Sequence, residues 1–344
     1  MSAEALKAAI RRLAFGESLS ADDAAAAFEV IMRGDAAPAQ VGALLMGLRV
    51  KGETPDEVAG AARAMRAAMV RLPSDAPDAL VDTCGTGGGA VQTFNISTAA
   101  ALVAAGGGAR VAKHGNRSFT SRSGSADVLE ALGVPIEAPV EVMERALADA
   151  GIVFMFAPLM HPAMKHVGPV RRELAVPTVM NIVGPLANPA SAGRQVLGVA
   201  EEARLPLLAG ALQALGTEHA LVVHGAPGMD EISPLGPTRA VEIRHGAIQE
   251  YSIDPFALGF GSVSAGDLAG GDPVENARTI LEVLEGKGSP GARAAVLLNA
   301  GAALYVAGLA PTYRAGIDLA VTTLEEGKGM EALERLRKVY RRGE

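Results

Sequence analysis

One glycine-rich segment constrains the fold of this chain more than any other, because it links a short apolar strand to the start of a helix. It covers residues 81–98 and reads VDTCGTGGGAVQTFNIST. Four glycines between positions 85 and 89 let the backbone turn tightly and point successive N–H groups at an anion. Asn95 and Ser97 then precede an apolar helix expected over 99–105, whose positive end faces the same point. The segment therefore predicts a phosphate cradle.

Two commoner glycine motifs fit this segment less well. The spacing of Gly85, Gly87 and Ala90 matches a dinucleotide-binding turn, but the acidic residue expected about 20 positions later is absent and position 110 is Arg. A P-loop requires Lys directly after its last glycine, whereas Ala90 follows Gly89. A Walker-type nucleotide site is therefore excluded. A glycine-rich turn without a ligand stays open on this segment alone, since short motifs often occur by chance.

Positive charge gathers just after the glycine segment. Between Gly106 and Ser125 the chain carries four fixed cations and no carboxylate, although its formal net charge is -7. These cations are Arg110, Lys113, Arg117 and Arg122. A local basic loop in an acidic chain indicates a small polyanionic ligand rather than nucleic acid, which prefers a broad basic face. A solvated surface loop is the alternative.

The pattern of expected elements divides the chain in two. Residues 1–72 read as helices, and one begins at a capping box formed by Thr54 and Glu57. A chain of 344 residues exceeds what one core usually supports, so two domains are expected. After a proline-containing linker at 72–78, apolar strands alternate with helices, which is typical of a largely parallel sheet with helices on its faces. The expected strands cover 79–83, 109–113, 152–156, 195–199 and 219–224.

Three polar segments are predicted to meet at one edge of this sheet. The glycine segment, residues 113–118 (KHGNRS) and the acids Asp230 and Glu231 each lie at or after the carboxyl end of a strand, where parallel sheets bind ligands. Adjacent acids in a phosphate site suggest Mg2+, which takes carboxylate and substrate oxygens. A pair of surface acids is the alternative. His161 and His166 have no further ligands at zinc-like spacing, so zinc is not expected.

A series of motifs carries a family resemblance. They are GTGGG, TFNIST, KHGNRS, SGSADVLEALGV, HPAMKHVGPVRREL, GPLANP and HGAPGMDE. In this order and at this spacing the chain resembles anthranilate phosphoribosyltransferase over nearly its full length. The resemblance implies a small all-helical N-terminal domain, 1–72 joined by about 161–184. It also implies a larger α/β domain, 73–160 and 185–344, with a mostly parallel central sheet and helices on its faces. A homodimer formed through the helical domain is expected.

The same resemblance implies the reaction. The 5-phosphoribosyl group passes from phosphoribosyl pyrophosphate (PRPP) to the amine of anthranilate, which gives N-(5-phosphoribosyl)anthranilate and pyrophosphate in tryptophan biosynthesis. Positive charge develops on the sugar as pyrophosphate departs, so prearranged donors must stabilise the leaving group. An aromatic amine is already neutral at neutral pH, and no residue is therefore assigned as a catalytic acid or base.

The resemblance also implies the binding residues. Those expected to bind PRPP are Gly85, Gly88, Gly89, Thr93, Asn95, Ile96, Ser97, Thr98, Lys113, His114, Gly115, Asn116, Arg117, Ser118, Phe119, Thr120, Ser121 and Ser125. Those expected around anthranilate are Gly85, His114, Asn116 and Arg171. The ligands expected for two Mg2+ ions are Ser97, Asp230 and Glu231. Arg171 would bind the anthranilate carboxylate, because a guanidinium fork matches it bidentately. A surface Arg171 paired with Glu173 is the alternative.

The chain departs from the family pattern at a few positions. Gly89 stands where the glycine motif of the family commonly ends in Asp, which removes a carboxylate from the pyrophosphate site. Pro177 and Met180 replace the more usual Arg and Phe. Of these departures, we predict that Gly89 mainly alters the dependence on Mg2+.

Composition bears on the cellular location. The single cysteine, Cys84, excludes an internal disulfide, fits a reducing compartment and is expected to be buried filler. Lys7, Arg11 and Arg12 interrupt the first apolar segment, so no secretory signal is expected and the predicted location is the cytoplasm. The 17-residue uncharged run at 294–310 is short for a membrane span and reads as a buried helix.

Two other functions stay open on the sequence. A pyrimidine nucleoside phosphorylase of related fold would use inorganic phosphate and a nucleoside, but KHGNRS and Arg171 favour the transferase. A non-enzymatic relative that binds nucleic acid would need a broad basic surface, which a net charge of -7 opposes.

Overall fold

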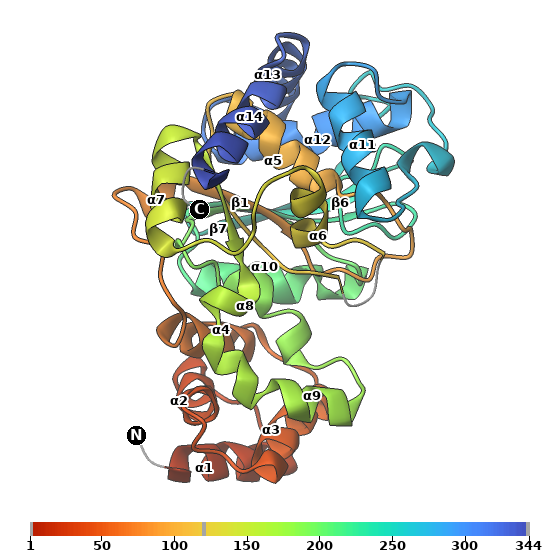
Figure 1. The fold of residues 1–344 in the computed structure, drawn as a ribbon. Helices are drawn as coiled ribbons and strands as arrows, with labels where there is room; N and C mark the ends of the chain where they lie inside the picture. Colours follow the sequence, from red (N-terminus) through yellow and green to blue (C-terminus); the bar gives the residue numbers. More distant parts are fainter. Residues whose placement is uncertain (1–2, 119–121, 342–344) are drawn as a thin grey trace.

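The computed structural model describes residues 3–118 and 122–341. Phe119, Thr120 and Ser121, which belong to the predicted PRPP-binding loop, lie outside these described residues. Figure 1 shows a helical part, which carries the N-terminus, beneath a larger part built around a central sheet. The predicted fold class, helical at the N-terminus and α/β with a mostly parallel sheet beyond it, is confirmed.

The helices of the N-terminal part begin where local side chains cap them. Ser20 accepts a hydrogen bond from the N–H of Asp23 at 3.1 Å, and Thr54 and Glu57 form the expected reciprocal capping box. Glu57 is fully buried and also accepts from the Lys51 ammonium at 2.9 Å, which supplies its counter-charge. The helices are α1 (Ala3–Ala14), α2 (Ala21–Met32), α3 (Pro38–Lys51) and α4 (Pro55–Ala67).

A later segment of the chain packs against these helices. The helical piece expected over 161–173 consists of η2 (Pro162–His166) and α9 (Gly168–Leu174), and α8 (Ala157–Met160) precedes them. Figure 1 shows α9 beside α3. Val170 of α9 shares one buried core with Phe28 of α2 and with Leu208 on the sheet side. The N-terminal part therefore has no isolated core, and α4 packs against α10 (Leu205–Ala214), the helix that covers this face of the sheet.

The described strands form one sheet in the order β3-β2-β1-β4-β5-β6-β7. Neighbours from β3 to β5 run parallel, whereas β6 and β7 add an antiparallel edge. The sequence predicted the first five strands within two residues at each end and missed β6 and β7. The bounds are β1 (Leu80–Gly85), β2 (Arg110–Gly115), β3 (Ile152–Phe156), β4 (Arg194–Gly198), β5 (His219–Gly225), β6 (Thr238–Arg244) and β7 (Ala247–Ile253).

Helices cover both faces of the sheet. Figure 1 shows α5 and α12 to α14 on one face, and α10 on the other face next to the helical part. These helices are α5 (Ile96–Gly106), α6 (Ser125–Ala131), α7 (Val140–Asp149), α10 (Leu205–Ala214), α11 (Pro273–Leu284), α12 (Pro290–Val306), α13 (Tyr313–Glu325) and α14 (Lys328–Arg341). Short 3-10 turns are η1 (Pro77–Ala79), η3 (Val179–Asn181), η4 (Gly184–Leu186), η5 (Glu202–Arg204) and η6 (Ala265–Leu268). Residues 294–304 of α12 are all buried, as expected. Of the helices within the described ranges, none is long and apolar enough to cross a membrane.

The connections between the two parts lie side by side. The N–H of Val70, after α4, donates to the carbonyl of Met160 at 2.8 Å. The N–H of Leu72 donates to the carbonyl of Pro189 at 3.0 Å. The three connections, near 70, 160 and 189, are therefore hydrogen-bonded to one another just below the sheet.

Candidate active site

The three polar segments meet at the carboxyl ends of the strands, as predicted. The N–H of Gly87 donates to the Oδ2 atom of Asp230 at 2.8 Å. The N–H of Ser97 donates to the Oε1 atom of Glu231 at 3.2 Å. The ammonium of Lys113 lies 3.4 Å from the Ser97 hydroxyl. One rim of the sheet therefore gathers the glycine segment, the adjacent acids and the lysine.

The glycine segment forms a fixed turn whose outer donors are free. Gly87 and Gly88 have φ values of 72° and 81°, a region that side chains other than glycine rarely adopt. Hydrogen bonds from Ala90 to the carbonyl of Gly228 and from Thr86 to the carbonyl of Gly198 hold the turn at both ends, at 2.7 and 2.9 Å. No described residue accepts from the N–H groups at positions 88 and 89. These two groups can therefore bind an anion.

Close approach explains two further glycines of the rim. A Cβ at Gly198 would lie 1.6 Å from the carbonyl oxygen of Asp230, and a Cβ at Gly85 would lie 2.5 Å from its Oδ2 atom. Both distances are shorter than any real contact of a Cβ. The two strand ends must therefore lack side chains for Asp230 to reach the glycine turn.

The N-terminus of α5 differs from the sequence prediction in two respects. The helix begins at Ile96 rather than at 99, and Asn95 occupies the capping position without a capping side-chain hydrogen bond. The N–H groups of Ile96, Thr98 and Ala99 bond to nearby carbonyls, and that of Ser97 bonds to Glu231. The first turn therefore offers no free N–H to a phosphate in this state. Its side chains still offer donors: the Thr98 hydroxyl is buried and has no partner among the described residues, and the Ser97 hydroxyl accepts from Lys113.

The side chain of Asn95 positions a neighbouring segment instead of capping the helix. Its Nδ2 group donates to the carbonyl of Ser123 at 3.1 Å, and its Oδ1 atom accepts from the Ser123 hydroxyl at 3.2 Å. Asn276 of α11 donates to the same Oδ1 atom at 2.9 Å. Asn95 therefore ties the segment after the KHGNRS loop to the C-terminal helices.

Carboxylates from outside residues 106–125 pair with the three arginines of this range. The pairs are Arg110 with Asp75 at 3.1 Å, Arg117 with Asp127 at 2.9 Å and with Glu130 at 2.5 Å, and Arg122 with Glu275 at 3.7 Å. Lys113, the cation that lies at the site itself, forms no such ion pair among the described residues. It is buried and donates to the carbonyl of Thr83 at 2.5 Å. Burial lowers the pKa of Lys113, while the carboxylates of Asp82 and Glu231 act in the opposite direction.

The adjacent acids have the properties of a cation site. Burial and the neighbouring Asp230 raise the pKa of Glu231 to about 8, and burial raises the pKa of Asp230. Two carboxylates that resist losing protons together are suited to sharing a divalent cation. Within residues 3–118 and 122–341, no three His, Cys, Asp or Glu side chains are grouped to hold a metal ion. The protein alone thus supplies a partial ligand set, which fits Mg2+, since that ion keeps waters and binds substrate phosphates.

The residues expected around anthranilate lie on both parts of the molecule. His114 of β2 is buried, and its ring lies 4.9 Å from the ring of His161. Burial lowers the pKa of His114 to about 3, so its ring is neutral and cannot act as an acid near neutral pH. Arg171 belongs to α9, and burial lowers its pKa. Among the described residues no carboxylate forms an ion pair with Arg171, and Glu173 on the same helix is exposed.

The remaining predicted residues lie along the same rim, most of them in supporting positions. Thr93 forms an isolated bridge with Ala269, and Ile96 is fully buried. The carbonyl of Asn116 accepts from the hydroxyl of Ser125 at 3.4 Å. The N–H of Ser118 donates to Asp127 at 3.1 Å, and Gly115 leaves room for the Ser125 side chain.

Two further candidates for a functional role, Asp82 and Asn188, were not predicted from the sequence. The structure also places Cys84. Asp82 and Asn188 are buried beneath the rim and bond to each other at 2.8 Å. Asn188 lies in the GPLANP motif, in the connection that follows η4. Cys84 is partly buried rather than fully buried; it accepts from the side chain of Gln195 at 3.1 Å, and burial of the thiol raises its pKa well above the usual range. A protonated thiol in this position supports the filler role.

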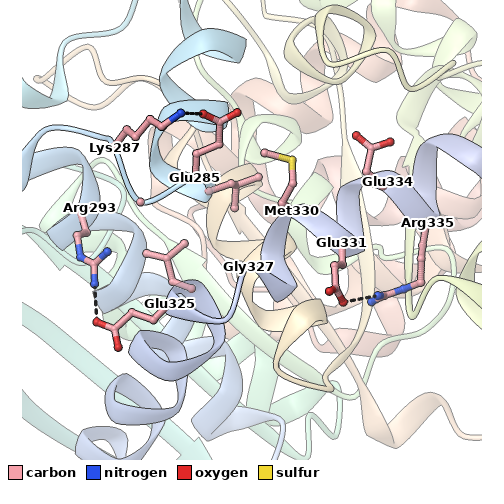
Figure 2. Close-up of a pocket in the computed structure, with 12 residues that line it drawn as sticks. Glu285, Lys287, Arg293, Glu325, Gly327, Met330, Glu331, Glu334 and Arg335 are labelled. Atoms are coloured by element: carbon pink, nitrogen blue, oxygen red, sulfur yellow. Dashed lines mark hydrogen bonds and ion pairs between the residues drawn. The ribbon is translucent and has the colours of Figure 1, made fainter.

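A wide surface hollow of about 980 Å³ lies away from this rim, between the ends of the C-terminal helices (Figure 2). Six of its charged side chains form three ion pairs, which Figure 2 shows. The pairs are Lys287 with Glu285 at 2.9 Å, Arg293 with Glu325 at 3.2 Å and Arg335 with Glu331 at 3.8 Å. None of the residues predicted to bind substrate or metal lines the hollow. Its chemistry therefore does not compete with the rim as the active site.

Comparison with known proteins identifies the family. The chain matches the Glycosyl transferase family, helical bundle domain, over residues 7–69, and the Glycosyl transferase family, a/b domain, over residues 77–330. The anthranilate phosphoribosyltransferase of Rubrobacter xylanophilus is 52% identical over 339 residues, which cover 98% of each chain. The crystal structure of the anthranilate phosphoribosyltransferase from Thermus thermophilus matches with a TM-score of 0.90 at 43% identity, over 97% of this chain and 99% of that chain.

A more distant relative was solved with ligands. The anthranilate phosphoribosyltransferase from Saccharomyces cerevisiae in complex with PRPP and Mg matches with a TM-score of 0.88 at 28% identity, over 99% of both chains. None of these likenesses favours a nucleoside phosphorylase or a nucleic-acid-binding protein. Fold, rim geometry and full-length similarity agree, and the chain belongs to the anthranilate phosphoribosyltransferases, enzymes of the glycosyl transferase family.

Proposed function

We propose that this chain transfers the 5-phosphoribosyl group from PRPP to the amine of anthranilate, a step of tryptophan biosynthesis. One observation carries the proposal. The glycine turn and the N-terminus of α5 each donate an N–H to one of two adjacent acids, Gly87 to Asp230 at 2.8 Å and Ser97 to Glu231 at 3.2 Å. An anion cradle and a cation site thus share one rim, as a pyrophosphate leaving group with its metal requires.

The donor side of the site has the chemistry to stabilise pyrophosphate. The free N–H groups of Gly88 and Gly89 and the unpartnered Thr98 hydroxyl would donate to its oxygens. Lys113 would add a positive charge from below, and charge-assisted hydrogen bonds are worth about 1.5–3 kcal/mol each. Mg2+, when held by Asp230, Glu231 and the Ser97 hydroxyl, would neutralise charge on the departing phosphates. We propose two such ions.

The acceptor side needs positioning more than proton transfer. The amine of anthranilate is neutral near pH 7, and the neutral ring of His114 would wall the aromatic ring without binding its proton. Arg171 would bind the carboxylate of anthranilate from the helical part. Gly85 and Asn116 would contact the acceptor near its amine. Exclusion of water is the remaining requirement, because water competes for the same sugar cation.

We further propose the organisation of the chain in the cell. The helical domain comprises 1–72 and about 161–184, and the α/β domain comprises 73–160 and 185–344. Phe15 and Val50, at the ends of α1 and α3, are 82% and 81% exposed, which supports a homodimer formed through the helical domain. The single cysteine supports a cytoplasmic location.

Anthranilate fluorescence provides the test. Mixing the protein with PRPP, Mg2+ and anthranilate should remove the fluorescence of anthranilate and release pyrophosphate in equal amounts. A parallel reaction with inorganic phosphate and a pyrimidine nucleoside should release no base. Turnover of the nucleoside without loss of anthranilate would instead favour a phosphorylase.

A further inference from the structure

The two strands that carry the donor-binding segments stop pairing before they reach the rim. Within the described chain, β1 and β2 pair last at Val81 with Val111. On their outer sides the same strands stay paired for longer, β1 with β4 as far as Gly85 and β2 with β3 as far as Gly115. A gap therefore opens between β1 and β2 at their carboxyl ends, directly beneath the proposed site.

Buried side chains bridge this gap in place of backbone hydrogen bonds. The carboxylate of Asp82, on β1, accepts from the N–H of His114 on β2 at 3.3 Å. The ammonium of Lys113, on β2, donates to the carbonyl of Thr83 on β1 at 2.5 Å. Buried backbone groups need such partners, because an unpaired one costs about as much free energy as a lost hydrogen bond. The spacing of the two strands thus depends on side chains.

A third side chain enters the gap from outside both strands. Asn188 is 3% exposed, and its Nδ2 group donates to the Oδ2 atom of Asp82 and to the carbonyl of Ala112, both at 2.8 Å. Its Oδ1 atom accepts from the N–H of Ala190 at 2.9 Å. Both hydrogens of the amide are therefore used, one on each strand, and its oxygen fixes the local turn.

Asn188 belongs to the connection through which the chain returns from the helical part to β4. The neighbouring Pro189 accepts from the N–H of Leu72, in the outgoing connection, at 3.0 Å. The carbonyl of Leu186 accepts from the guanidinium of Arg66, on α4, at 2.8 Å. One residue thus attaches the junction between the two parts to the strands that carry the glycine turn and the buried lysine.

We propose that Asn188 is a positioning residue for the transfer reaction. Its amide locks the return connection into the gap between β1 and β2, and so holds Lys113 and the loop after it in register with the glycine turn. The proposal rests on the proposed function, in which PRPP phosphates bind across these two segments. A loss of register would weaken PRPP binding more than anthranilate binding. The PRPP phosphates bind across both segments, whereas the anthranilate carboxylate is held by Arg171 on α9, and only the contacts of anthranilate with Gly85, His114 and Asn116 depend on this gap.

Asn188→Ala tests this role, since it removes the three hydrogen bonds and leaves the groups proposed to touch substrate unchanged. We expect KM for PRPP, and the Kd for PRPP measured by calorimetry with Mg2+, to rise about tenfold or more. KM for anthranilate should change by less than about threefold. Tyr340→Phe is the matched control, because the Tyr340 hydroxyl bonds both backbone groups of Phe154 on β3, at 3.1 and 2.7 Å. The control should lower Tm and leave both KM values unchanged.

A reciprocal exchange separates the hydrogen bond from general packing. Asp82→Asn combined with Asn188→Asp restores a hydrogen bond between the two side chains with donor and acceptor reversed, while the bond to the carbonyl of Ala112 stays lost. The double variant should bind PRPP more tightly than either single variant. If the Asn188→Ala variant does not fold, Asn188→Ser replaces it in the test, because the serine hydroxyl can supply one of the two donors. Its KM and Kd for PRPP should rise less than those expected for Asn188→Ala.

The outcomes separate this proposal from the proposed function. An Asn188 variant that lowers Tm but keeps wild-type values of KM and Kd for PRPP overturns the positioning role. Wild-type protein that binds PRPP but does not consume anthranilate contradicts the proposed function alone, and the calorimetric comparison still decides on Asn188. If the wild-type protein does not bind PRPP, both the proposed function and the positioning role of Asn188 are contradicted.

Discussion

The N–H of Ser97 and the carboxylate of Glu231 form a hydrogen bond of 3.2 Å at the start of α5. The carboxylate therefore occupies the end of the helix that the sequence predicted to face a phosphate. Burial and the neighbouring Asp230 raise the pKa of Glu231 to about 8, so this group keeps its proton near neutral pH in the absence of a cation. Binding of Mg2+ at Asp230 and Glu231 must release that proton.

This relationship predicts a pH-dependent affinity for Mg2+. A proton competes with the metal below the pKa of Glu231, so the apparent affinity should rise on the order of tenfold per pH unit up to about 8 and level off above it. Calorimetric titration of the PRPP complex with Mg2+, between about pH 6.5 and 9, measures the slope. Glu231→Gln cannot titrate and should bind Mg2+ weakly without this slope. A wild-type affinity that does not change over the range contradicts the prediction.

Gly89 adjoins the same acids and predicts a second effect on Mg2+. A Cβ at position 89 would lie 3.1 Å from the Oδ1 atom of Asp230 and 3.1 Å from the carbonyl of Gly228, contacts that a small shift relieves. Gly89→Asp would thus place a further carboxylate beside Asp230. We expect half-saturation at a Mg2+ concentration lower by about threefold or more. Gly89→Ala controls for the added volume, and identical Mg2+ curves for wild type and Gly89→Asp would contradict the prediction.

The sequence predicted the rim correctly because the residues that form it follow the strands directly in the chain. Short apolar strands ended at the glycine turn, at KHGNRS and near Asp230, and parallel strands bring such ends together. The antiparallel edge was missed for equally local reasons. Strand β7 is largely exposed and reads AIQEYSI, which lacks an apolar run. The turn between β6 and β7 consists of His245 and Gly246, both with positive φ, rather than of the Asn-Gly pair typical of such hairpins.

Interactions between distant residues escaped the sequence analysis. Residues 106–125 contain cations and no carboxylate, yet Asp75 pairs with Arg110 at the start of β2 and Glu275 pairs with Arg122, both from distant parts of the chain. Asp82 and Asn188 are separated by 106 residues, and no local pattern links them. Charge balance and buried hydrogen bonds depend on contacts that a linear pattern does not contain. The sequence therefore predicted where the site lies better than how its parts are held.

Arg171 is predicted to select the acceptor. It is partly buried, and no described carboxylate pairs with it, so its guanidinium can bind the carboxylate of anthranilate. Arg171→Ala should raise KM for anthranilate roughly ten- to a hundredfold, equivalent to about 1.5–3 kcal/mol, and leave KM for PRPP nearly unchanged. Arg172→Ala, an exposed neighbour on the same helix, should have little effect on either value. Equal losses for both substrates of Arg171→Ala would refute the assignment.

The buried histidine pair predicts a loss of stability in acid. Burial lowers the pKa of His161 to about 4 and that of His114 to about 3, whereas a histidine in the unfolded chain has a pKa near 6.5. As pH falls below about 6.5, the unfolded chain takes up protons that the folded protein refuses, so stability decreases toward pH 4. His161→Phe keeps a ring beside His114 and removes one titrating group. Its free energy of unfolding, measured in urea, should fall less steeply between about pH 6.5 and 4.5. Parallel pH profiles for variant and wild type would contradict this.

Asn276 predicts that α11 supports PRPP binding from behind the site. It is buried, donates to the Oδ1 atom of Asn95 at 2.9 Å and accepts from the N–H of Gly271 at 2.7 Å. Because Asn95 holds Ser123, Asn276→Ala should loosen the segment that follows the KHGNRS loop. We expect KM for PRPP to rise about three- to tenfold with KM for anthranilate unchanged.

The control for Asn276 lies on the same helix. The hydroxyl of Thr279 donates to the carbonyl of Glu275 at 3.2 Å, within the helix, and it reaches no part of the site. Thr279→Ala should therefore leave both KM values at the wild-type level. If the two variants show equal KM values for PRPP, α11 does not hold the donor-binding segment through Asn95. A larger KM for PRPP in Asn276→Ala alone would mean that PRPP binding depends on the contact between Asn95 and Asn276. The structure that supports the PRPP site would then include α11, a helix about 180 residues after the glycine turn.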